Sequence, residues 1–440
     1  MKKLSGGRIP HRKSTVGMSP ETLPTPKSVT IPMSMHVGAP AKILVKVGDG
    51  VKVGQKIGET DGFISAPIHA SVSGKVTKIT EVLMPSGKKS PAVVVETDGL
   101  QESSPELCPH PVETFAQFIE AVRESGAVGL GGAGFPTAVK LGVKNSAEVE
   151  EIIINGAECE PYITSDTITM TDNTESVAQG AELLLQFFPN SRVLMGIEKN
   201  NPLAIKALSD RCTGNPAIRV CSLPSLYPQG GEKVMIFNLT GKIVPEGKFP
   251  VDVGTIVINC TTLAKIMEYI KTGMPLVSKC VTVDGSAVKR PANVIVPIGT
   301  PIAEVLTFCD TSVDDVKKII MGGPMMGIAV RDSSAPVLKN NNAILAFAET
   351  DTAPAKETEC IRCGRCVKVC PLNLMPFQME LAHSLEKPES LERLKVNLCM
   401  ECGICAYSCP AARPLVQKIK LGKLMLRSYQ DKKREQEVAK

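Results

Sequence analysis

Residues 360–371 read CIRCGRCVKVCP, and residues 399–410 read CMECGICAYSCP. Each run places three cysteines at the spacing CxxCxxC and a fourth three residues later, directly before a proline. This spacing is typical of domains with two [4Fe–4S] clusters, in which the fourth cysteine of each run ligates the other cluster. The first cluster is therefore expected on Cys360, Cys363, Cys366 and Cys409. The second is expected on Cys370, Cys399, Cys402 and Cys405.

Zinc is the alternative metal for these runs, because CxxC pairs also bind tetrahedral zinc. Zinc modules usually have two well-separated pairs, so a third cysteine at the same spacing followed by Cys-Pro favours iron–sulfur clusters. The other seven of the 15 cysteines stand singly, mostly near apolar runs, and we expect them to lie in packed interiors. They are Cys108, Cys159, Cys212, Cys221, Cys260, Cys280 and Cys309.

The composition of the 440-residue chain is that of several packed domains, with 43% hydrophobic and 22% charged residues. No apolar run is long enough to cross a bilayer, and the basic start lacks the apolar stretch of a signal peptide. We therefore expect a cytoplasmic chain with no transmembrane segment of its own. Residues 1–15 carry five basic groups and no acid, and residues 418–440 carry eight basic and three acidic groups. Basic ends suit an anionic lipid surface, an acidic protein or nucleic acid, and solvated termini are the alternative.

Residues 1–105 are predicted to form a barrel-sandwich-like β domain. Short β elements separated by glycines occupy residues 29–80, and residues 45–57 and 66–75 resemble the two halves of a biotinyl- or lipoyl-type domain. Such carriers present a modified lysine in a tight hairpin, but residues 60–67 contain no lysine. The scaffold is therefore expected without the swinging-arm function.

The next two regions are predicted to form an α/β domain at residues 106–273 and a small β-grasp-like module at residues 274–350. In the first, helical periodicity alternates with strand-like runs, which predicts a mostly parallel sheet covered by helices. Helices are expected at 115–123, 177–188, 203–210 and 263–270, and strands at 151–155, 192–197, 218–221 and 255–259. Residues 351–440 then form the ferredoxin-type domain with its basic tail.

A glycine-rich loop at residues 129–137, GLGGAGFPT, contains the pattern GxGxxG. As a Rossmann fingerprint the pattern is weak, because the residues before it are helical rather than a strand. Its four glycines still allow the backbone to approach a planar or phosphorylated ligand closely, with Pro136 opening a helix and Lys140 one turn into it. A tight structural turn is the alternative.

Together with three motifs that follow in order, this loop resembles the flavin-binding region of the NADH-oxidising subunit of respiratory complex I. Residues 155–161, NGAECEP, stand where that family has Asn-x-Asp-Glu-x-Glu-Pro, with Ala157 replacing the aspartate. Residues 227–233, YPQGGEK, resemble its Gly-Glu-Glu loop, with Lys233 replacing the second glutamate. Residues 257–264, VINCTTLA, resemble its Asn-Asn-Val-Glu-Thr-Leu-Ala motif, with Ile258 replacing the first asparagine.

The resemblance implies two sets of binding residues, and it implies no catalytic side chain because hydride transfer takes place on the FMN itself. Residues expected to bind FMN are Gly131, Gly132, Gly134, Lys140, Asn155, Glu158, Tyr227, Gly231, Asn259 and Thr262. Residues expected to face NADH are Phe135, Glu160 and Glu232.

From Gly6-Gly7 to the cysteine runs, the chain is similar to the C subunits of Rnf complexes, which are membrane ferredoxin:NAD⁺ oxidoreductases coupled to ion translocation. Residues 24–40 and the segment Gly322–Gly327 fit the same family. The implied fold is multidomain α/β, with a barrel-sandwich-like domain, a Rossmann-like flavin domain of complex I type, a β-grasp (SLBB-like) module and a 2[4Fe–4S] ferredoxin-like helical domain.

The function implied by this resemblance is that of an NAD-linked oxidoreductase subunit. It would exchange hydride with NAD(H) at FMN and pass single electrons through two [4Fe–4S] clusters. It would lie at the cytoplasmic face of the cell membrane, bound to the other Rnf-type membrane subunits and to a ferredoxin-accepting iron–sulfur subunit, and not to nucleic acid. The alternatives are a soluble cobalamin-reductase-like flavin and iron–sulfur protein, and a flavin-free electron-relay scaffold.

Overall fold

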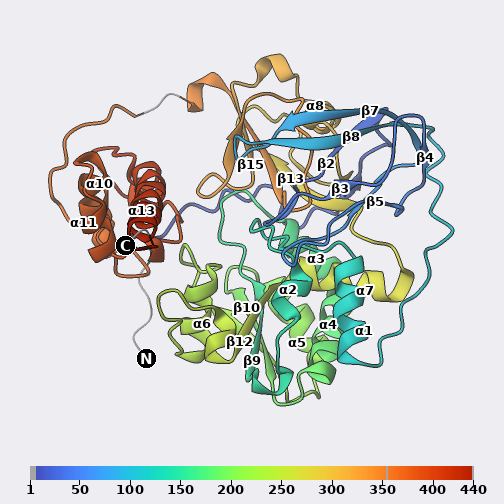
Figure 1. Ribbon diagram of the computed structural model, residues 1–440, viewed down its shortest axis with the longest axis horizontal. Helices are drawn as coiled ribbons and strands as arrows, with labels where there is room; N and C mark the ends of the chain where they lie inside the picture. Colours follow the sequence, from blue (N-terminus) through green and yellow to red (C-terminus); the bar gives the residue numbers. More distant parts are fainter. Residues whose placement is uncertain (1–5, 353–354, 439–440) are drawn as a thin grey trace.

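Two β-rich modules and one α/β module form the body of the protein, and a helical module lies beside them (Figure 1). The structure is a computed structural model and describes residues 6–352 and 355–438. In that part of the chain, no helix combines the length and the apolar character that a membrane span requires.

The N-terminal β module consists of two small antiparallel sheets with the strand orders β2-β8-β7-β4 and β3-β5-β6. Alternating residues of the long strands, such as Val29, Ile31, Val93 and Val95, are fully buried, as the two-residue period of a β-strand requires. The strands are β2 (Ser28–Pro32), β3 (Lys42–Ile43), β4 (Gly50–Val51), β5 (Lys56–Glu59), β6 (Ile68–His69), β7 (Gly74–Leu83) and β8 (Lys89–Thr97).

The second β module contains a six-stranded sheet with the order β1-β14-β13-β17-β15-β16. Its first strand comes from far upstream: β1 (Glu21–Thr22) pairs in parallel with β14, so the N-terminal segment contributes to this sheet. One continuous hydrophobic core, with residues from Leu23 to Ala346, joins both β modules. The remaining elements are β13 (Ser278–Asp284), β14 (Ala292–Pro297), α8 (Ile302–Phe308), β15 (Lys318–Met321), β16 (Ile328–Val330) and β17 (Ala343–Phe347).

The α/β module has a four-stranded, fully parallel sheet with the order β11-β10-β9-β12, which confirms the predicted sheet type. Its central strand is buried on both sides: Ile152 and Ile154 belong to one core and Ile153 to the other. The strands are β9 (Glu151–Gly156), β10 (Arg192–Glu198), β11 (Ile218–Leu223) and β12 (Thr255–Asn259). The helices are α1 (Phe115–Glu124), α2 (Thr137–Leu141), α3 (Ser165–Asp172), α4 (Thr174–Phe187), α5 (Pro202–Cys212), α6 (Glu232–Thr240) and α7 (Cys260–Thr272).

The strand order creates a switch point between β9 and β12. From β9 the chain proceeds to β10 and β11 on one side, and it then returns to place β12 on the other side of β9. In parallel α/β sheets, ligands bind at the carboxyl ends of the strands where the order reverses. We therefore expect a ligand site at this edge, formed by the residues that follow Gly156 and Asn259.

The C-terminal module is helical and has its own core of residues from Cys370 to Leu426. Its helices are α9 (Arg365–Lys368), α10 (Pro376–Ser384), α11 (Pro388–Arg393), α12 (Ile404–Tyr407) and α13 (Leu415–Val438). The long helix α13 lies beside α10 and α11 at the edge of the molecule (Figure 1).

Candidate cofactor sites

The glycine-rich loop before α2 is exposed at its tip and held in shape from within the α/β module. Leu130 N donates to Thr262 Oγ1 over 3.0 Å, and Gly134 N donates to Gly129 O over 3.0 Å. Gly132 and Gly134 have φ of +112° and +63°, values that L-residues with a side chain rarely adopt. No atom of the described residues lies within 4 Å of the place where a Cβ on Gly132 would be, so the tip leaves open space beside the backbone.

The second β module holds two carbonyl groups of this loop and one just before it. Lys339 Nζ donates to Gly126 O (2.7 Å), Lys279 Nζ donates to Leu130 O (2.6 Å), and Asn340 Nδ2 donates to Gly132 O (2.9 Å). Both lysines are fully buried, and burial lowers the pKa of Lys279 to about 8 and that of Lys339 to about 7.

The loop fits a polar or anionic ligand group. Within the described residues, the backbone N–H groups of Gly131, Gly132 and Ala133 have no acceptor, and these residues are exposed. Consecutive free N–H groups beside a positive-φ residue form an anion-binding concavity. Thr137, which begins α2, has a buried hydroxyl without a hydrogen-bond partner in the same part of the chain. These features suit FMN, with its phosphate and its polar ring edge.

The predicted asparagines lie at the switch point, beside the loop. Asn259 caps α7 by accepting from Thr262 N (3.0 Å), and it donates to Asp166 Oδ2 (2.7 Å). A Cβ on Gly131 would lie 3.1 Å from Asn259 Nδ2, so loop and cap are in contact. Asn155 donates from Nδ2 to Gly230 O over 2.9 Å. The structure thus brings four of the predicted FMN residues, Gly131, Asn155, Asn259 and Thr262, to one edge of the sheet.

Glu158 is engaged in structural contacts. Its carboxylate accepts from the N–H groups of Asp166 and Thr167 at the start of α3, and Lys13 Nζ lies 3.5 Å from it. Lys13 Nζ also donates to Glu158 O and Ile163 O. Burial raises the pKa of Glu158, and Lys13 opposes the rise. Lys13 belongs to the basic N-terminal run of the sequence, but it is used inside the protein and is not available to an external partner.

Lys140 and Glu232 form an ion pair of 2.6 Å across the site, and Lys140 Nζ also donates to Val257 O. Glu232 is the first residue of α6, and Gly231 is its N-cap. The predicted FMN residue Lys140 therefore contacts the predicted NADH residue Glu232. Phe135 is partly exposed, and its carbonyl accepts from Gly129 N (2.9 Å).

Glu160 joins the α/β module to the second β module. Its carboxylate accepts from Met325 N (3.0 Å) and Met326 N (2.8 Å), and Tyr227 Oη donates to it over 3.3 Å. Burial raises the pKa of Glu160 to about 7, although these hydrogen bonds oppose the rise. A Cβ on Gly323 would collide with this carboxylate, which accounts for a glycine at that position.

Tyr227 and Gly231 bring the α/β module against the second cysteine run. Tyr227 is buried and donates from Oη to Cys402 O over 2.7 Å. A Cβ on Gly231 would collide with the end of the Met400 side chain, and Tyr227, Cys402 and Ile404 share one small apolar cluster. The loop that carries two predicted FMN residues is therefore also the contact surface for the cysteine loop.

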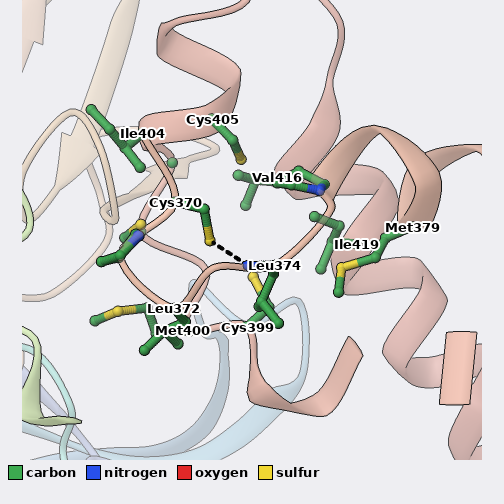
Figure 2. Close-up of a pocket in the computed structure, with 14 residues that line it drawn as sticks. Cys370, Leu372, Leu374, Met379, Cys399, Met400, Ile404, Cys405, Val416 and Ile419 are labelled. Carbon is green, nitrogen blue, oxygen red and sulfur yellow. Dashed lines mark hydrogen bonds between the residues drawn. The ribbon is translucent and has the colours of Figure 1, made fainter. Parts of the chain in front are cut away.

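The structure gathers Cys370 with three cysteines of the other run. Cys370, Cys399, Cys402 and Cys405 line one cavity together with apolar side chains such as Ile404 and Ile419 (Figure 2). Cys370 Sγ accepts from Leu374 N over 3.4 Å. Among the predicted ligands of the other cluster, Cys366 and Cys409 lie in one apolar cluster, whereas Cys360 and Cys363 are exposed.

Zinc and an iron–sulfur cluster need different arrangements of cysteine ligands. A tetrahedral zinc ion needs four ligand atoms about 2–2.3 Å from one point. Each iron of an iron–sulfur cubane takes one thiolate, and four cysteines line this one cavity.

Several contacts in the flavin region were not anticipated from the sequence. Lys13, Lys279, Lys339 and Asn340 lie 145 or more residues away from the groups that they bind. No local motif marks these four residues. The only signal in the sequence is that Lys279 and Lys339 stand in mostly apolar segments, where a buried lysine is unusual. A sequence motif records neighbours along the chain, and these contacts join separate modules.

Family models match four segments of the chain. They are described as the RnfC barrel sandwich hybrid domain (residues 3–100), the Nuo51 FMN-binding domain (residues 122–268), the SLBB domain (residues 280–329) and the 4Fe-4S dicluster domain (residues 359–412). The predicted fold class, with its four kinds of module, and the predicted cluster-binding and FMN-binding domains are confirmed by these matches.

Curated relatives match most of the chain. The C subunit of the proton-translocating ferredoxin:NAD(+) oxidoreductase complex of Clostridium ljungdahlii is 39% identical over 87% of this chain and 84% of its own. The C subunit of the Na(+)-translocating ferredoxin:NAD(+) oxidoreductase complex of Acetobacterium woodii is 40% identical over 84% of both chains. The C subunit of the ion-translocating oxidoreductase complex of Rhodobacter capsulatus is 36% identical over 98% of this chain and 84% of its own.

Among solved structures, an NAD⁺-reducing [NiFe]-hydrogenase in the air-oxidised state resembles this protein in fold. The TM-score is 0.50 with 19% sequence identity, over 70% of this chain and 62% of that chain.

Proposed function

Because this chain belongs to the family of C subunits of ion-translocating ferredoxin:NAD⁺ oxidoreductase complexes, we propose that it is the subunit in which such a complex exchanges hydride with NAD(H) and passes single electrons through two [4Fe–4S] clusters. The observation that carries the proposal is the direct contact between the two candidate sites. Tyr227, at the candidate flavin site, donates to the carbonyl of the predicted cluster ligand Cys402 over 2.7 Å.

FMN, when bound, supplies the conversion between two-electron hydride transfer and one-electron transfer. The chain's own residues hold and orient it. The N–H groups of Gly131, Gly132 and Ala133, which have no acceptor among the described residues, offer donors, and Asn155 and Asn259 line the switch point. Lys140 offers a cation at the same edge, which its ion pair with Glu232 holds in place.

The nucleotide is proposed to bind near Phe135, Glu160 and Glu232. Glu160 gives this face a fixed shape, because it holds the backbone of Met325 and Met326 against the α/β module. The remaining predicted FMN residues, Gly134, Glu158, Tyr227, Gly231 and Thr262, shape the same region, and their contacts are with the protein itself.

Eight cysteines are proposed to hold the clusters, in the two sets Cys360, Cys363, Cys366, Cys409 and Cys370, Cys399, Cys402, Cys405. The cavity of the second set is lined by apolar side chains that limit the access of water. This set also lies beside the α/β module, which suits it to exchange electrons with the candidate flavin site.

The proposed location is the cytoplasmic face of the cell membrane. The chain would be a peripheral subunit, bound to the other membrane subunits and to an iron–sulfur subunit that accepts electrons from ferredoxin. The domain limits proposed for it are residues 1–105, 106–273, 274–350 and 351–440.

The full chain, purified without oxygen, tests the proposal. We expect acid treatment to release FMN, iron and sulfide assays to give about eight of each per chain, and NADH to bleach the visible absorbance of the clusters. A chain with clusters but no flavin would be a relay scaffold. A chain with both cofactors that does not associate with its membrane would be a soluble flavoprotein of the cobalamin-reductase type.

A further inference from the structure

The carbonyl groups of the glycine-rich loop are bound from outside the α/β module. Lys279, on β13, donates to Leu130 O, and Asn340, just before β17, donates to Gly132 O. Lys339, next to Asn340, donates to both Pro67 O and Gly126 O, which fixes the segment that carries Asn340. All three donors belong to the second β module.

The two lysines are unusual for buried residues. Their side chains are almost fully excluded from water, and neither forms an ion pair with any described carboxylate. Burying a cation is costly unless its donors are bound to good acceptors, and here the acceptors are backbone carbonyls at the candidate flavin site and its surroundings. Apolar side chains in these places could pack between the modules but could not hold a carbonyl, so each lysine fixes the backbone that it binds.

Peptide geometry links these contacts to the ligand side of the loop. In a planar trans peptide, the C=O and the following N–H point in opposite directions. Holding Leu130 O therefore turns the N–H of Gly131 away from Lys279, and holding Gly132 O turns the N–H of Ala133 away from Asn340. These N–H groups lack an acceptor within the described residues.

We propose that Lys279, Lys339 and Asn340 are positioning residues for the flavin, and that the second β module is thus part of the flavin site. They fix the loop so that its free N–H groups face the cofactor, which then binds to a preorganised surface. The inference rests on the proposed function, since it takes the loop to be the FMN site.

The test uses the full chain with its clusters intact and its flavin removed, titrated with FMN. Asn340→Asp keeps the size of the side chain but loses the donor, and we expect the Kd for FMN to rise about tenfold. Asn340→Gln keeps a donor and should recover most of the affinity. Lys279→Met should weaken FMN binding at least as much. Lys317→Ala is the matched control, because Lys317 lies on the same module and its side chain is 61% exposed.

The melting temperature without FMN and the cluster absorbance separate positioning from general stability. If Asn340 is a positioning residue, Asn340→Asp changes the Kd for FMN and leaves the melting temperature without FMN and the cluster absorbance unchanged. The inference would be overturned if the variant had an unchanged Kd for FMN. It would also be overturned if the melting temperature of the FMN-free variant fell enough to account for the weaker binding. Either result would leave the proposed function intact. A wild-type chain that does not bind FMN would overturn the proposed function, and the inference with it.

Discussion

At the scale of single residues, Glu160 shows how one carboxylate can serve both the fold and the candidate site. It is nearly buried, it accepts three hydrogen bonds, and it has no cation within ion-pair distance among the described residues. Burial without a direct cation makes the charged form costly, so the carboxyl holds its proton to about pH 7 rather than losing it near the ordinary value of 4.5.

This shift predicts a pH dependence of stability. Because the folded-state pKa of Glu160 lies above its unfolded value, the contribution of the group is full below pH 4.5 and is lost as the pH rises through about 7. Relative to Glu160→Gln, the wild type should therefore lose stability between about pH 4.5 and 7, the unfolded and folded pKa values, by at most about 3 kcal/mol. Melting temperatures of both proteins across this range measure the difference. Glu198 titrates in the same range, but it is common to both proteins and cancels. A difference that is constant with pH would contradict the assignment.

Gly132 carries the second prediction at this scale. A Cβ there would meet no atom of the described residues, but a valine would be forced out of φ +112°, which changes the loop at a cost of about 1–2 kcal/mol. We expect Gly132→Val to weaken FMN binding about tenfold, measured by flavin fluorescence. Gly87→Val is the control, because Gly87 also has positive φ and open surroundings but lies in an exposed turn of the N-terminal β module. Equal effects of both variants on FMN would argue against the loop as the site.

At the scale of elements, hydrophobic periodicity predicted the helices that bury one apolar face and the strands that are buried on both faces of the sheet. The structure has α1, α4, α5, α7 and the four parallel strands within a few residues of the predicted limits. It also has α3, which was not predicted, since four of its eight residues are polar threonines or a serine and it lacks an apolar stripe. Glu158 compensates by accepting two N–H groups at its start, a tertiary contact that no local pattern records.

The pairing of the cysteine runs can be tested at this scale with a double variant. If Cys370 belongs to the cluster of the second run, Cys370→Ala and Cys402→Ala damage the same cluster, and the double variant should keep about four irons. If each run instead held its own cluster, the double variant would lose both. Iron and sulfide assays with EPR of the reduced protein measure the outcome. Cys309→Ala, in the core of the β modules, is the control and should retain all iron.

At the scale of the whole molecule, the modules are less separate than the sequence indicates. The two β modules share one core, and β1 joins a sheet that is otherwise built from residues 278–347. Composition and motifs could predict what kind of module each segment forms. They could not predict that Lys279, Lys339 and Asn340 reach the glycine-rich loop, because such contacts depend on how the finished modules pack together.

The last prediction concerns how the chain docks in its complex, through the basic side of α13. One face of the helix is apolar and packed against the module, since Leu415, Ile419 and Leu426 are buried. Part of the basic side is engaged within the protein: Lys423 donates to Cys399 O and pairs with Glu401, and Lys420 pairs with the same glutamate. Among the described residues, Lys418 and Arg427 form no ion pair and are thus available to an anionic surface.

The test variant combines Lys418→Gln and Arg427→Gln with truncation after residue 427. We expect it to leave the membrane fraction at moderate salt, because each basic group near an anionic surface contributes about 1 kcal/mol to membrane binding. Sedimentation with native membranes measures the loss, and NADH-dependent dye reduction should persist because the candidate flavin site lies in another module. Replacing the exposed Lys317 and Lys318 of the second β module by glutamine is the matched control. Sedimentation of the chain with vesicles of anionic lipid alone identifies the docking partner. Binding to these vesicles indicates a lipid surface, whereas binding only to membranes that contain the other subunits indicates acidic protein loops. If the variant sediments like the wild type in both assays, the exposed basic groups of α13 have no docking role, and the helix serves the packing of the cluster domain.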